Sequence, residues 1–429
     1  MKVIPRDQHC ISRKYISDSA LKVMARLRSS NHEAYLVGGA VRDLLLGGHP
    51  KDFDIATDAT PEQVNALFRN SRIIGRRFRI VHVRFGREII EVTTFRGHHD
   101  AEASNRHNSR SHQSSSGMLL RDNVYGTLEE DAVRRDLTVN ALYYDSKTFE
   151  VFDHVHGLDD LARRSICIIG EPVQRFREDP VRMLRVLRFA AKLDFSIERH
   201  TAAAIPECVH LLADIPAARL FDEFLKLFLA GYAEATLKLL LDHKLLTYLF
   251  PESAHLISTD PAAAALTQAA MRNTDRRIAS NMPVTPAFQL AALLWPAVER
   301  LYDRLRAKNT SPIEAMHSAA QQVVFASARS LAIPKRFSQP MREIWELQLR
   351  LEKRARKASD LLTHRRFRAA YDFLLLREEA GAQTDGLGQW WTDFQEQPEQ
   401  QQQIQSAANE QTIQRRRRRP RKRRASNEP

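Results

Sequence analysis

The sequence has 429 residues, of which 43% are hydrophobic and 8% aromatic, and its formal net charge is +13 at pH 7. This composition excludes wholesale disorder and indicates two or three domains. Only three cysteines occur, without paired spacing, which excludes a disulfide framework and a cysteine-based zinc site. No apolar run is long enough for a signal peptide or a transmembrane helix, which predicts a soluble, cytoplasmic protein.

The first part of the chain alternates short apolar runs with amphipathic ones. The apolar runs have strand length and the amphipathic runs have helical spacing, and glycine or a capping threonine marks their limits. Together they predict a small mixed α/β sheet. In chain order we expect a strand at 34–38, a helix at 39–48, a strand at 52–56, a helix at 60–68 and a hairpin of 77–85 with 87–95 around Gly86.

A glycine pair, Gly38–Gly39, lies between the first predicted strand and its helix. Glycine lets backbone amides approach a phosphate closely, and the start of a helix adds positive potential. Arg42, one turn into the helix, could present a charged fork to the same anion. A glycine pair alone is weak evidence, because tight strand-to-helix turns use glycine anyway.

The next strand carries Asp52 and Asp54 in the run KDFDIAT. Residues two apart on a strand share a face, so these carboxylates are expected to lie close together, with Phe53 and Ile55 on the opposite face. Two such carboxylates repel each other unless a cation neutralises them. The pair therefore predicts a divalent-metal site, and the preceding glycine turn predicts a triphosphate beside it.

A two-metal site for phosphoryl transfer needs a third carboxylate. Glu91 is the best candidate on spacing, because its strand is expected to lie beside the strand at 52–56. Asp136 is the second candidate. A solvent-facing edge position for Glu91 remains an equal alternative at this stage.

Residues 97–117 are poor in apolar side chains and rich in Ser, Asn, His and Arg, which predicts a flexible surface excursion. Their four histidines lack fixed carboxylate or cysteine partners, so a mobile loop is favoured over a metal site. After them, a helix is expected over 129–142, followed by a hairpin at 143–153, a helix at 157–164 and a strand at 165–170.

The helix expected at 129–142 places Arg135, Asp136 and Asn140 near one another. Positions 136 and 140 would share a helical face. The arginine could neutralise phosphates, while the carboxylate and the amide could bond ribose hydroxyls. An exposed polar face with routine ion pairs is the alternative, and the residues in isolation favour it.

Almost everything after residue 171 has helical spacing. In REDPVRMLRVLRFAAKL, Asp179 and Pro180 resemble an N-cap and a first-turn proline. Arg182 and Arg185 belong to a basic stripe along this helix. A carboxylate beside an arginine fork offers donors and acceptors to the edge of a base, although capping plus a solvated stripe would explain the same residues.

The C-terminal segment first becomes rich in glutamine and then strongly basic, which predicts disorder. A run of nine positive side chains cannot pack and suits a nucleic-acid phosphate backbone, and we favour this over a solubility tail or a localisation patch. The nine residues are Arg415, Arg416, Arg417, Arg418, Arg419, Arg421, Lys422, Arg423 and Arg424.

Taken together, these motifs resemble the class II nucleotidyltransferases, which include tRNA CCA-adding enzymes and bacterial poly(A) polymerases. LVGGAVRDLLLG followed by DFDIAT resembles their first motif, and RRDLTVNAL resembles their second. DHVHGLDDL is similar to their interdomain motif, and EDPVRMLR is similar to the motif that selects the nucleotide. The resemblance spans about residues 15–250 in consistent order.

This resemblance implies an α+β fold: a polymerase-β-like head, a helical neck and body, and a disordered basic tail. It also implies two Mg²⁺ ions on Asp52 and Asp54, and template-free nucleotide addition to RNA 3′ ends. The expected catalytic set is Asp52, Asp54, Glu91 and Asp136, and the expected nucleotide-binding set is Gly38, Gly39, Arg42, Asp43, Arg135, Asn140, Asp179, Arg182 and Arg185. The expected domains are a head (1–150), a neck (151–250), a helical body (251–378) and the tail (379–429).

Within that family, IIGRRFRIVHV at 73–83 resembles the signature of bacterial poly(A) polymerases. We therefore expect AMP transfer from ATP to RNA 3′ ends, in RNA polyadenylation and turnover, with RNA-decay proteins as possible partners. CCA addition to tRNA is the enzymatic alternative. An RNA-binding protein on a transferase scaffold is the non-enzymatic alternative, which the paired aspartates disfavour.

Overall fold

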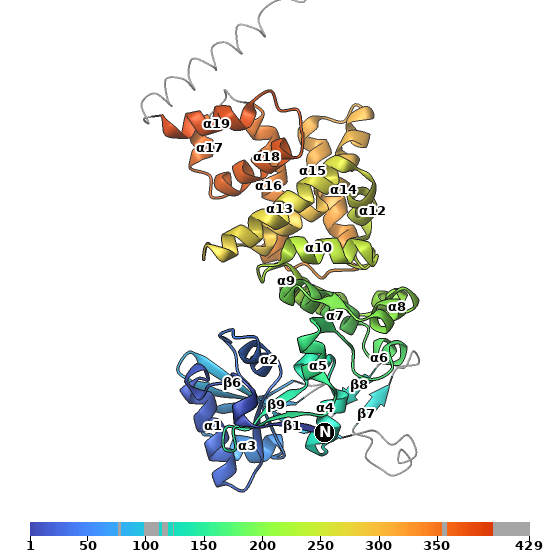
Figure 1. Ribbon diagram of the computed structural model, residues 1–429. Helices are drawn as coiled ribbons and strands as arrows, with labels where there is room; N and C mark the ends of the chain where they lie inside the picture. The colour runs from blue at the N-terminus through green and yellow to red at the C-terminus, as the bar shows by residue number, and fades with distance from the viewer. Residues whose placement is uncertain (76–78, 98–110, 114–118, 123, 354–357, 398–429) are drawn as a thin grey trace, which may run out of the picture. The chain divides into compact units, whose positions relative to one another are not determined.

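The computed structural model describes residues 1–75, 79–97, 111–113, 119–122, 124–353 and 358–397 (Figure 1). The chain divides into two compact units, unit 1 over Met1–Asp214 and unit 2 over Ile215–Pro429. Among the described residues, no helix has the length and apolar character needed to cross a membrane. The basic run at 415–424 lies outside the described residues.

Unit 1 is built around a mixed eight-stranded sheet with the strand order β1-β10-β9-β2-β3-β6-β5-β4. The strand β3 runs antiparallel to β2 and parallel to β6, so it lies between the two other strands that carry predicted site residues. This confirms the expected mixed sheet. The strands are β1 (Lys2–Ile4), β2 (Ala34–Val37), β3 (Asp54–Thr57), β4 (Ser71–Ile74), β5 (Ile80–Phe85), β6 (Glu88–Thr94), β9 (Leu142–Tyr144) and β10 (Val151–Asp153).

Alternation along the central strands gives the sheet two apolar faces. On one face, side chains such as Leu36 and Ile55 join a core with helices α1 (Asp18–Ser29), α2 (Gly39–Leu45) and α3 (Pro61–Leu67). On the other face, Val37 and Ala56 pack with α4 (Leu128–Arg134). Burial on both sides fixes the register of β2 against β3, and this register sets the positions of the residues at their ends.

The remainder of unit 1 is mostly helical, with two small sheets (Figure 1). β7 (Ser111–Gln113) pairs with β8 (Leu119–Asp122), and β11 (Ser165–Ile166) pairs in parallel with β12 (Ser196–Ile197). The helices are α5 (Gly157–Ala162), α6 (Pro172–Glu178), α7 (Val181–Leu193) and α8 (Arg199–Cys208), with the short 3-10 helices η4 (Thr138–Asn140) and η5 (Val209–Asp214).

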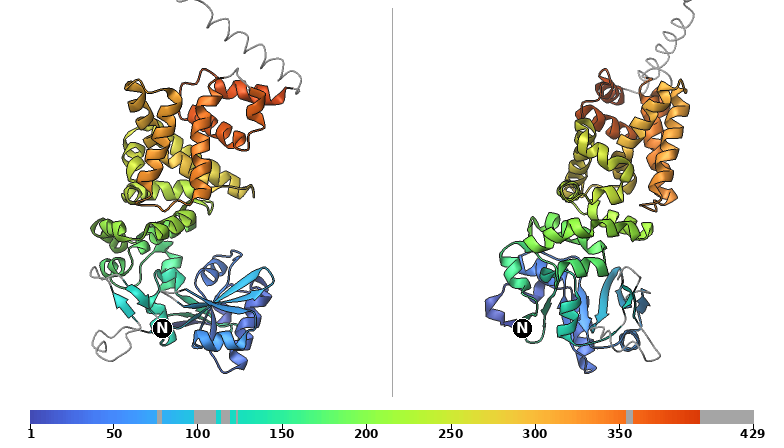
Figure 2. Two further views of the ribbon diagram at one scale, coloured as in Figure 1. Left: turned by 180° about the vertical axis from the view of Figure 1, so that it is seen from behind. Right: turned by 90° about the vertical axis from the view of Figure 1, so that its right-hand side faces the viewer.

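Unit 2 is helical throughout its described part, as expected (Figure 2). Its interior includes Trp345 and Trp391, which are fully buried and donate through their indole N–H groups to backbone carbonyls. The helices are α9 (Ala217–Phe228), α10 (Ala233–Asp242), α11 (Leu246–Leu249), α12 (Pro251–Thr259), α13 (Pro261–Ala279), α14 (Pro286–Ala307), α15 (Pro312–Ser327), α16 (Lys335–Leu351), α17 (Ala358–Leu362), α18 (Phe367–Glu379) and α19 (Leu387–Glu396).

The helix expected over 129–142 is wrong beyond Arg134. Arg135 and Leu137 are extended and Asp136 lies in a bend between them, because this segment hydrogen-bonds to residues 167–169. The main-chain N–H of Thr138 donates to the Cys167 carbonyl over 3.0 Å, and the N–H of Ile169 donates to the Asp136 carbonyl over 3.0 Å. Asp136 and Asn140 therefore do not share a helical face.

Two further expectations at element ends are wrong, and one is only partly testable. Asp52 is not part of the predicted strand, since β3 begins at Asp54. Asp179 is the C-cap of α6 rather than an N-cap, because Pro180 disfavours the helical conformation in the residue before it. Of the excursion at 97–117, residues 111–113 form β7, and 98–110 and 114–117 lie outside the described residues.

Candidate functional site

The glycine turn at the end of β2 faces the start of β3. Gly38 has φ +77° and ψ −136°, a conformation that only glycine adopts without strain. A Cβ at this position would lie 3.9 Å from Asp54 Oδ2 and 3.8 Å from Arg135 Nη1. The structure therefore brings the predicted glycine turn, a predicted carboxylate and a predicted arginine to one place.

Three carboxylates act on one another at this place. Asp54 pairs in register with Glu91 of β6, and Asp52 lies exposed two residues before β3. Burial, together with the nearby charges of Glu91 and Asp52, raises the pKa of Asp54 to about 6 against the opposing effect of Arg135. This site holds more negative charge than its surroundings neutralise.

Glu91 also has a neighbour on the adjacent strand. His82 of β5 lies across from it, with Nε2 at 3.1 Å from Glu91 Oε1. Glu91 thus has Asp54 on one side and His82 on the other. Among the described residues, no three His, Cys, Asp or Glu side chains are assembled closely enough to hold a metal by themselves.

Arg135 is fixed by a buried network behind the glycine turn. Its Nε and Nη2 donate to Asp131 Oδ2 over 3.1 and 3.0 Å, and Nε also donates to the Tyr143 hydroxyl over 2.9 Å. The Tyr143 hydroxyl donates in turn to the same Asp131 oxygen over 2.7 Å. These bonds orient the guanidinium and leave Nη1 at the glycine turn.

Arg42 differs from its predicted role as a direct phosphate ligand, because its side chain is only 1% exposed. It donates to the Asn140 side-chain oxygen and, through Nε, to Asp43 Oδ1 over 2.8 Å. Its guanidinium also lies over the Phe189 ring, 5.0 Å from the centroid. Arg42 therefore ties α2 to η4 and α7 beneath the glycine turn.

Asp136, the second candidate for the third carboxylate, is engaged elsewhere. It accepts a 2.5 Å hydrogen bond from Arg185 Nε on α7. Burial acts to raise its pKa, but the Arg185 charge and hydrogen bond outweigh burial and hold the pKa far below its usual range. The geometry therefore places Glu91, and not Asp136, beside Asp54.

The base-reading candidates lie at the junction of α6 and α7. The Arg182 guanidinium donates to Glu178 over 2.8 Å and to the Arg175 carbonyl over 2.9 Å. Its main-chain N–H donates to the Asp179 carbonyl over 2.9 Å. The bond between Asp179 and Arg182 is thus one of the backbone, and Glu178 fixes the direction of the Arg182 guanidinium.

Several residues of this constellation were missed in the sequence. Asp131 and Tyr143 orient Arg135, and Glu178 orients Arg182. In the basic stripe on α7, Arg182, Arg185 and Lys192 are paired with the acids Glu178, Asp136 and Asp43. Glu178 is adjacent to Asp179 and could have been included on that ground, whereas no local pattern marks Asp131 or Tyr143.

Family models match the chain in three segments. Residues 34–167 match a family described as the poly A polymerase head domain. Residues 194–257 match the family "Probable RNA and SrmB- binding site of polymerase A". Residues 308–425 match the family described as the polymerase A arginine-rich C-terminus.

Curated relatives cover most of the chain. Poly(A) polymerase I of Escherichia coli O157:H7 is 51% identical over 399 residues, which cover 92% of this chain and 85% of that protein. Poly(A) polymerase I of Haemophilus influenzae is 45% identical, covering 93% and 90%. The CCA-adding enzyme of Bacillus pumilus is more distant, with 39% identity over 53% of each chain.

Solved structures show a similar fold. The CCA-adding enzyme of Bacillus stearothermophilus in complex with CTP matches with a TM-score of 0.57 and 26% identity, over 87% of this chain and 80% of that one. The Thermotoga maritima CCA-adding enzyme complexed with tRNA matches with a TM-score of 0.59 over 92% and 86%. The latter is 18% identical, so it supports the fold alone.

Proposed function

The chain belongs to the poly(A) polymerase family of nucleotidyltransferases, and we propose that it transfers AMP from ATP to the 3′-hydroxyl of RNA and releases pyrophosphate. The observation that carries this proposal is the Asp54 carboxylate, which faces a glycine turn and has Glu91 and Asp52 as acidic neighbours. In such a transfer, positioning and charge neutralisation supply most of the rate.

The acidic residues fit a divalent cation. The raised pKa of Asp54 reflects burial and acidic neighbours, and a bound cation would favour the ionised form. Mg²⁺ is commonly held by one or two carboxylates and completes its shell with water and substrate phosphates. Asp52 and Asp54 would therefore hold it, with Glu91 as the neighbouring acid, although among the described residues no three acidic side chains form a ready-made cluster. When bound, Mg²⁺ would neutralise phosphate charge and lower the pKa of the attacking hydroxyl.

The remaining site residues position the triphosphate and the base. The missing side chain of Gly38 leaves space next to Asp54, and Arg135 Nη1 borders that space. Arg135 can therefore contact a phosphate oxygen without first breaking its bonds to Asp131. Arg42 acts as a positioning residue, because it holds Asn140 and Asp43 rather than substrate.

Adenine recognition is proposed for Asp179 and Arg182. The Arg182 guanidinium is fixed by Glu178 and by the Arg175 carbonyl, so its orientation is set before a base arrives. Preorganised polar groups of this kind reject bases that leave them unpaired. Arg185 supports the same helix by pairing with Asp136.

RNA 3′ ends are the proposed acceptors, with Arg415 to Arg424 as a recruiting arm for the phosphate backbone. The match of 194–257 to a probable RNA-binding and SrmB-binding segment is consistent with further contacts to RNA or to RNA-decay proteins. The four-part domain division and a cytoplasmic location complete the proposal.

An extension assay tests the reaction and separates it from CCA addition. The protein is incubated with Mg²⁺ and either ATP alone or CTP alone, and with either an unstructured RNA or a tRNA lacking CCA. Long adenylate tracts on the unstructured RNA support the proposal. Incorporation of CTP restricted to the tRNA would assign CCA addition, and RNA binding without incorporation would assign a non-enzymatic role.

Two glutamates on β6 offer a matched test of the third carboxylate. Glu91→Gln removes the acid that pairs in register with Asp54, whereas Glu88→Gln changes a carboxylate three residues earlier on the same strand. We expect extension to slow by roughly 10- to 100-fold in Glu91→Gln, from the loss of one charge at a metal site. Equal rates in the two variants would remove Glu91 from the proposed catalytic set.

A further inference from the structure

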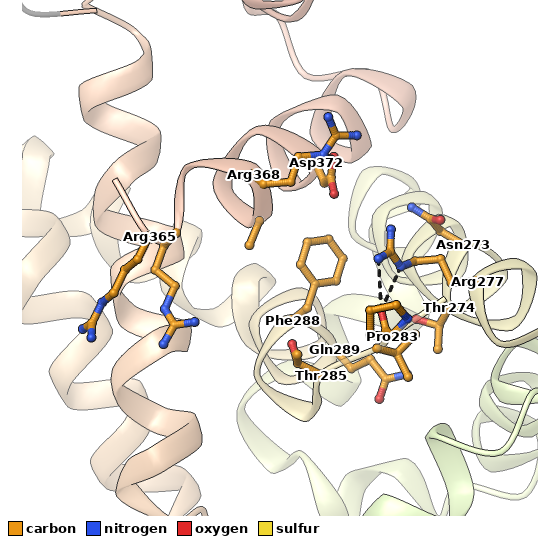
Figure 3. A pocket seen from close by; sticks show the side chains of 13 residues that line it. Asn273, Thr274, Arg277, Pro283, Thr285, Phe288, Gln289, Arg365, Arg368 and Asp372 are labelled. Carbon is orange, nitrogen blue, oxygen red and sulfur yellow. Dashed lines mark hydrogen bonds and ion pairs between the residues drawn. The ribbon is translucent and has the colours of Figure 1, made fainter. Parts of the chain in front are cut away.

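A pocket of about 240 Å³ lies within unit 2, far along the sequence from the acidic site. It is formed where the end of α13, the loop after it, the start of α14 and the segment 365–372 meet (Figure 3). This volume is somewhat below the ~300–1,000 Å³ of pockets for drug-sized ligands. The pocket thus suits a single nucleotide rather than a folded RNA.

The lining is strongly basic. Four arginines contribute to it, Arg277, Arg365, Arg366 and Arg368, against one lining carboxylate, Asp372. Arg365 and Arg366 share the Glu343 carboxylate over 2.5 and 3.1 Å, so two positive charges meet one negative charge there. Each guanidinium carries five N–H donors, and these bonds use one nitrogen of each. Donors therefore remain for an anion such as a phosphate.

An aromatic ring stands among these charges. Phe288, on the first turn of α14, is partly exposed and is drawn amid the labelled side chains of the pocket in Figure 3. Its ring meets Phe373 edge-on, with a centroid distance of 6.1 Å and an interplanar angle of 82°. This packing fixes the ring. Fixed aromatic rings next to arginines are the usual platform for a single-stranded base.

A buried amide forms part of the pocket wall. Gln289 is 1% exposed and lines the same pocket. Its Nε2 donates to the Phe228 carbonyl over 2.5 Å, which determines the orientation of the amide. The other amide atom, Oε1, has no hydrogen-bond partner. This oxygen has almost no accessible surface, so Gln289 supports the wall of the pocket and does not present an acceptor to a ligand.

We propose that this pocket binds one nucleotide of single-stranded RNA. The phosphate lies against the arginines, the base stacks on Phe288, and an exocyclic amino group donates to the Asp372 carboxylate. Adenine and cytosine carry such an amino group and uracil does not, so the pocket favours adenylate over uridylate. The inference rests on the proposed function only in taking RNA as the substrate.

Asp372 is suited to the acceptor role by its environment. Arg368 Nε donates to its Oδ1 over 3.0 Å, and Arg277 adds a second positive charge nearby. Burial raises the pKa of Asp372, and these two arginines oppose that effect. Its second oxygen can then accept from a base while Arg368 turns its remaining donors toward phosphate.

The test measures binding of 15-nucleotide oligo(A) and oligo(U) with 3′-blocked ends, by anisotropy, without ATP or Mg²⁺. The full chain is compared with Phe288→Ala and Arg368→Ala. Phe325→Ala and Arg304→Ala serve as matched controls, since Phe325 is 75% exposed and Arg304 is exposed, and both lie outside the pocket. Thermal melting verifies that each variant is folded.

Phe288→Ala should weaken oligo(A) binding about tenfold, as expected for the loss of one stacked base. Oligo(U) should be weakened less, so the ratio of the two dissociation constants falls. Arg368→Ala should weaken both oligonucleotides and reduce the slope of log K against log salt by about 0.7, the value for one single-strand phosphate. The ratio cancels phosphate contacts that do not distinguish bases, including those of the basic tail.

Two outcomes overturn the inference. If Phe288→Ala keeps the wild-type ratio of the dissociation constants for oligo(A) and oligo(U), Phe288 does not stack on a base. Competition by free AMP at the affinity of oligo(A), abolished by Phe288→Ala, would assign the pocket to free nucleotides instead of RNA. A wild-type chain that binds oligo(A) but fails to extend RNA with ATP would contradict the proposed reaction, while this binding experiment would still decide the pocket.

Discussion

The acidic site of unit 1 and the basic pocket of unit 2 carry excess charge of opposite sign. At the sheet, the negative charges of Glu91 and Asp52 disfavour ionisation of Asp54, and the nearby arginines are hydrogen-bonded to protein acceptors. In the helical pocket, arginines outnumber carboxylates, and an aromatic ring lies beside them. We propose that the first arrangement binds a cation and the second a phosphate, which would give the metal-bound nucleotide and the RNA separate sites on one chain.

A substitution at Asp54 should separate the two sites most clearly. Asp54→Asn should reduce adenylate transfer ~10³-fold or more, because a metal site contributes several kcal/mol to the transition state. Oligo(A) binding without Mg²⁺ should stay within about twofold, since the pocket in unit 2 is untouched. Rates are measured by single-turnover extension of labelled RNA. Substantial AMP incorporation by this variant would refute the role of Asp54 as a metal ligand.

Asp136 tests whether the arginines of unit 1 serve the fold. Asp136→Asn leaves Arg185 without its ion pair, and both side chains are largely buried, at 14% and 32% exposure. We expect a loss of about 2 kcal/mol in stability, below the ~3–5 kcal/mol of fully buried pairs. Chemical denaturation measures it, and Asp194→Asn, which removes a fully exposed partner of Arg164, should change nothing. Lost activity with unchanged stability would instead return Asp136 to the catalytic set.

Local signals and long-range contacts explain which parts of unit 1 could be predicted. The Thr60 capping box and the hairpin at Gly86 depend on residues close in sequence, and both were predicted within a few residues. The break after Arg134 could not be, because it is caused by hydrogen bonds to residues 167–169. Helical periodicity continues through that break, so the pattern alone extends the helix too far.

The candidate site shows the same division. The proximity of Asp54 and Glu91 follows from the adjacency of two strands, which alternation and spacing indicated. The pairing of Asp136 with Arg185 joins residues 49 positions apart and has no local signature. The burial of Arg42 depends on Asn140 and Phe189, which come from other elements. Sequence patterns therefore indicated that Glu91 neighbours Asp54, but they could not show that Arg42 and Arg185 bond to protein acceptors.

Removal of the basic tail tests how much of the RNA binding depends on the pocket in unit 2. A chain ending at Gln414 lacks nine positive side chains but keeps both the acidic site and the pocket. We expect RNA affinity at low salt to fall at least about tenfold and the salt slope to flatten, because each phosphate contact on a single strand contributes ~0.7 to that slope. The preference for oligo(A) over oligo(U) should persist. An unchanged slope would reassign the tail to a role other than phosphate binding.

The smallest expected effect concerns the charge of Asp54 in metal-free protein. Its pKa is raised from 3.8 to about 6 by burial and acidic neighbours, so the folded state prefers the protonated carboxyl. The associated stability is present below pH 3.8 and is lost as the pH rises through about 6. In EDTA, the free energy of unfolding of Asp54→Asn should therefore be about 1 kcal/mol higher than that of wild type at pH 7.5. At pH 4 the two values should differ little.

Denaturant titrations at these two pH values measure the difference, and Asp7→Asn, at an exposed position, controls for the loss of one surface charge. Mg²⁺ should reverse the ranking at pH 7.5, because an ion that binds only the folded wild type stabilises it by mass action. If the stability difference between wild type and Asp54→Asn does not depend on pH, burial and the acidic neighbours do not raise the pKa of Asp54. The acidic site would then have no excess negative charge for a cation to neutralise. It would differ from the basic pocket in its geometry but not in its electrostatic strain.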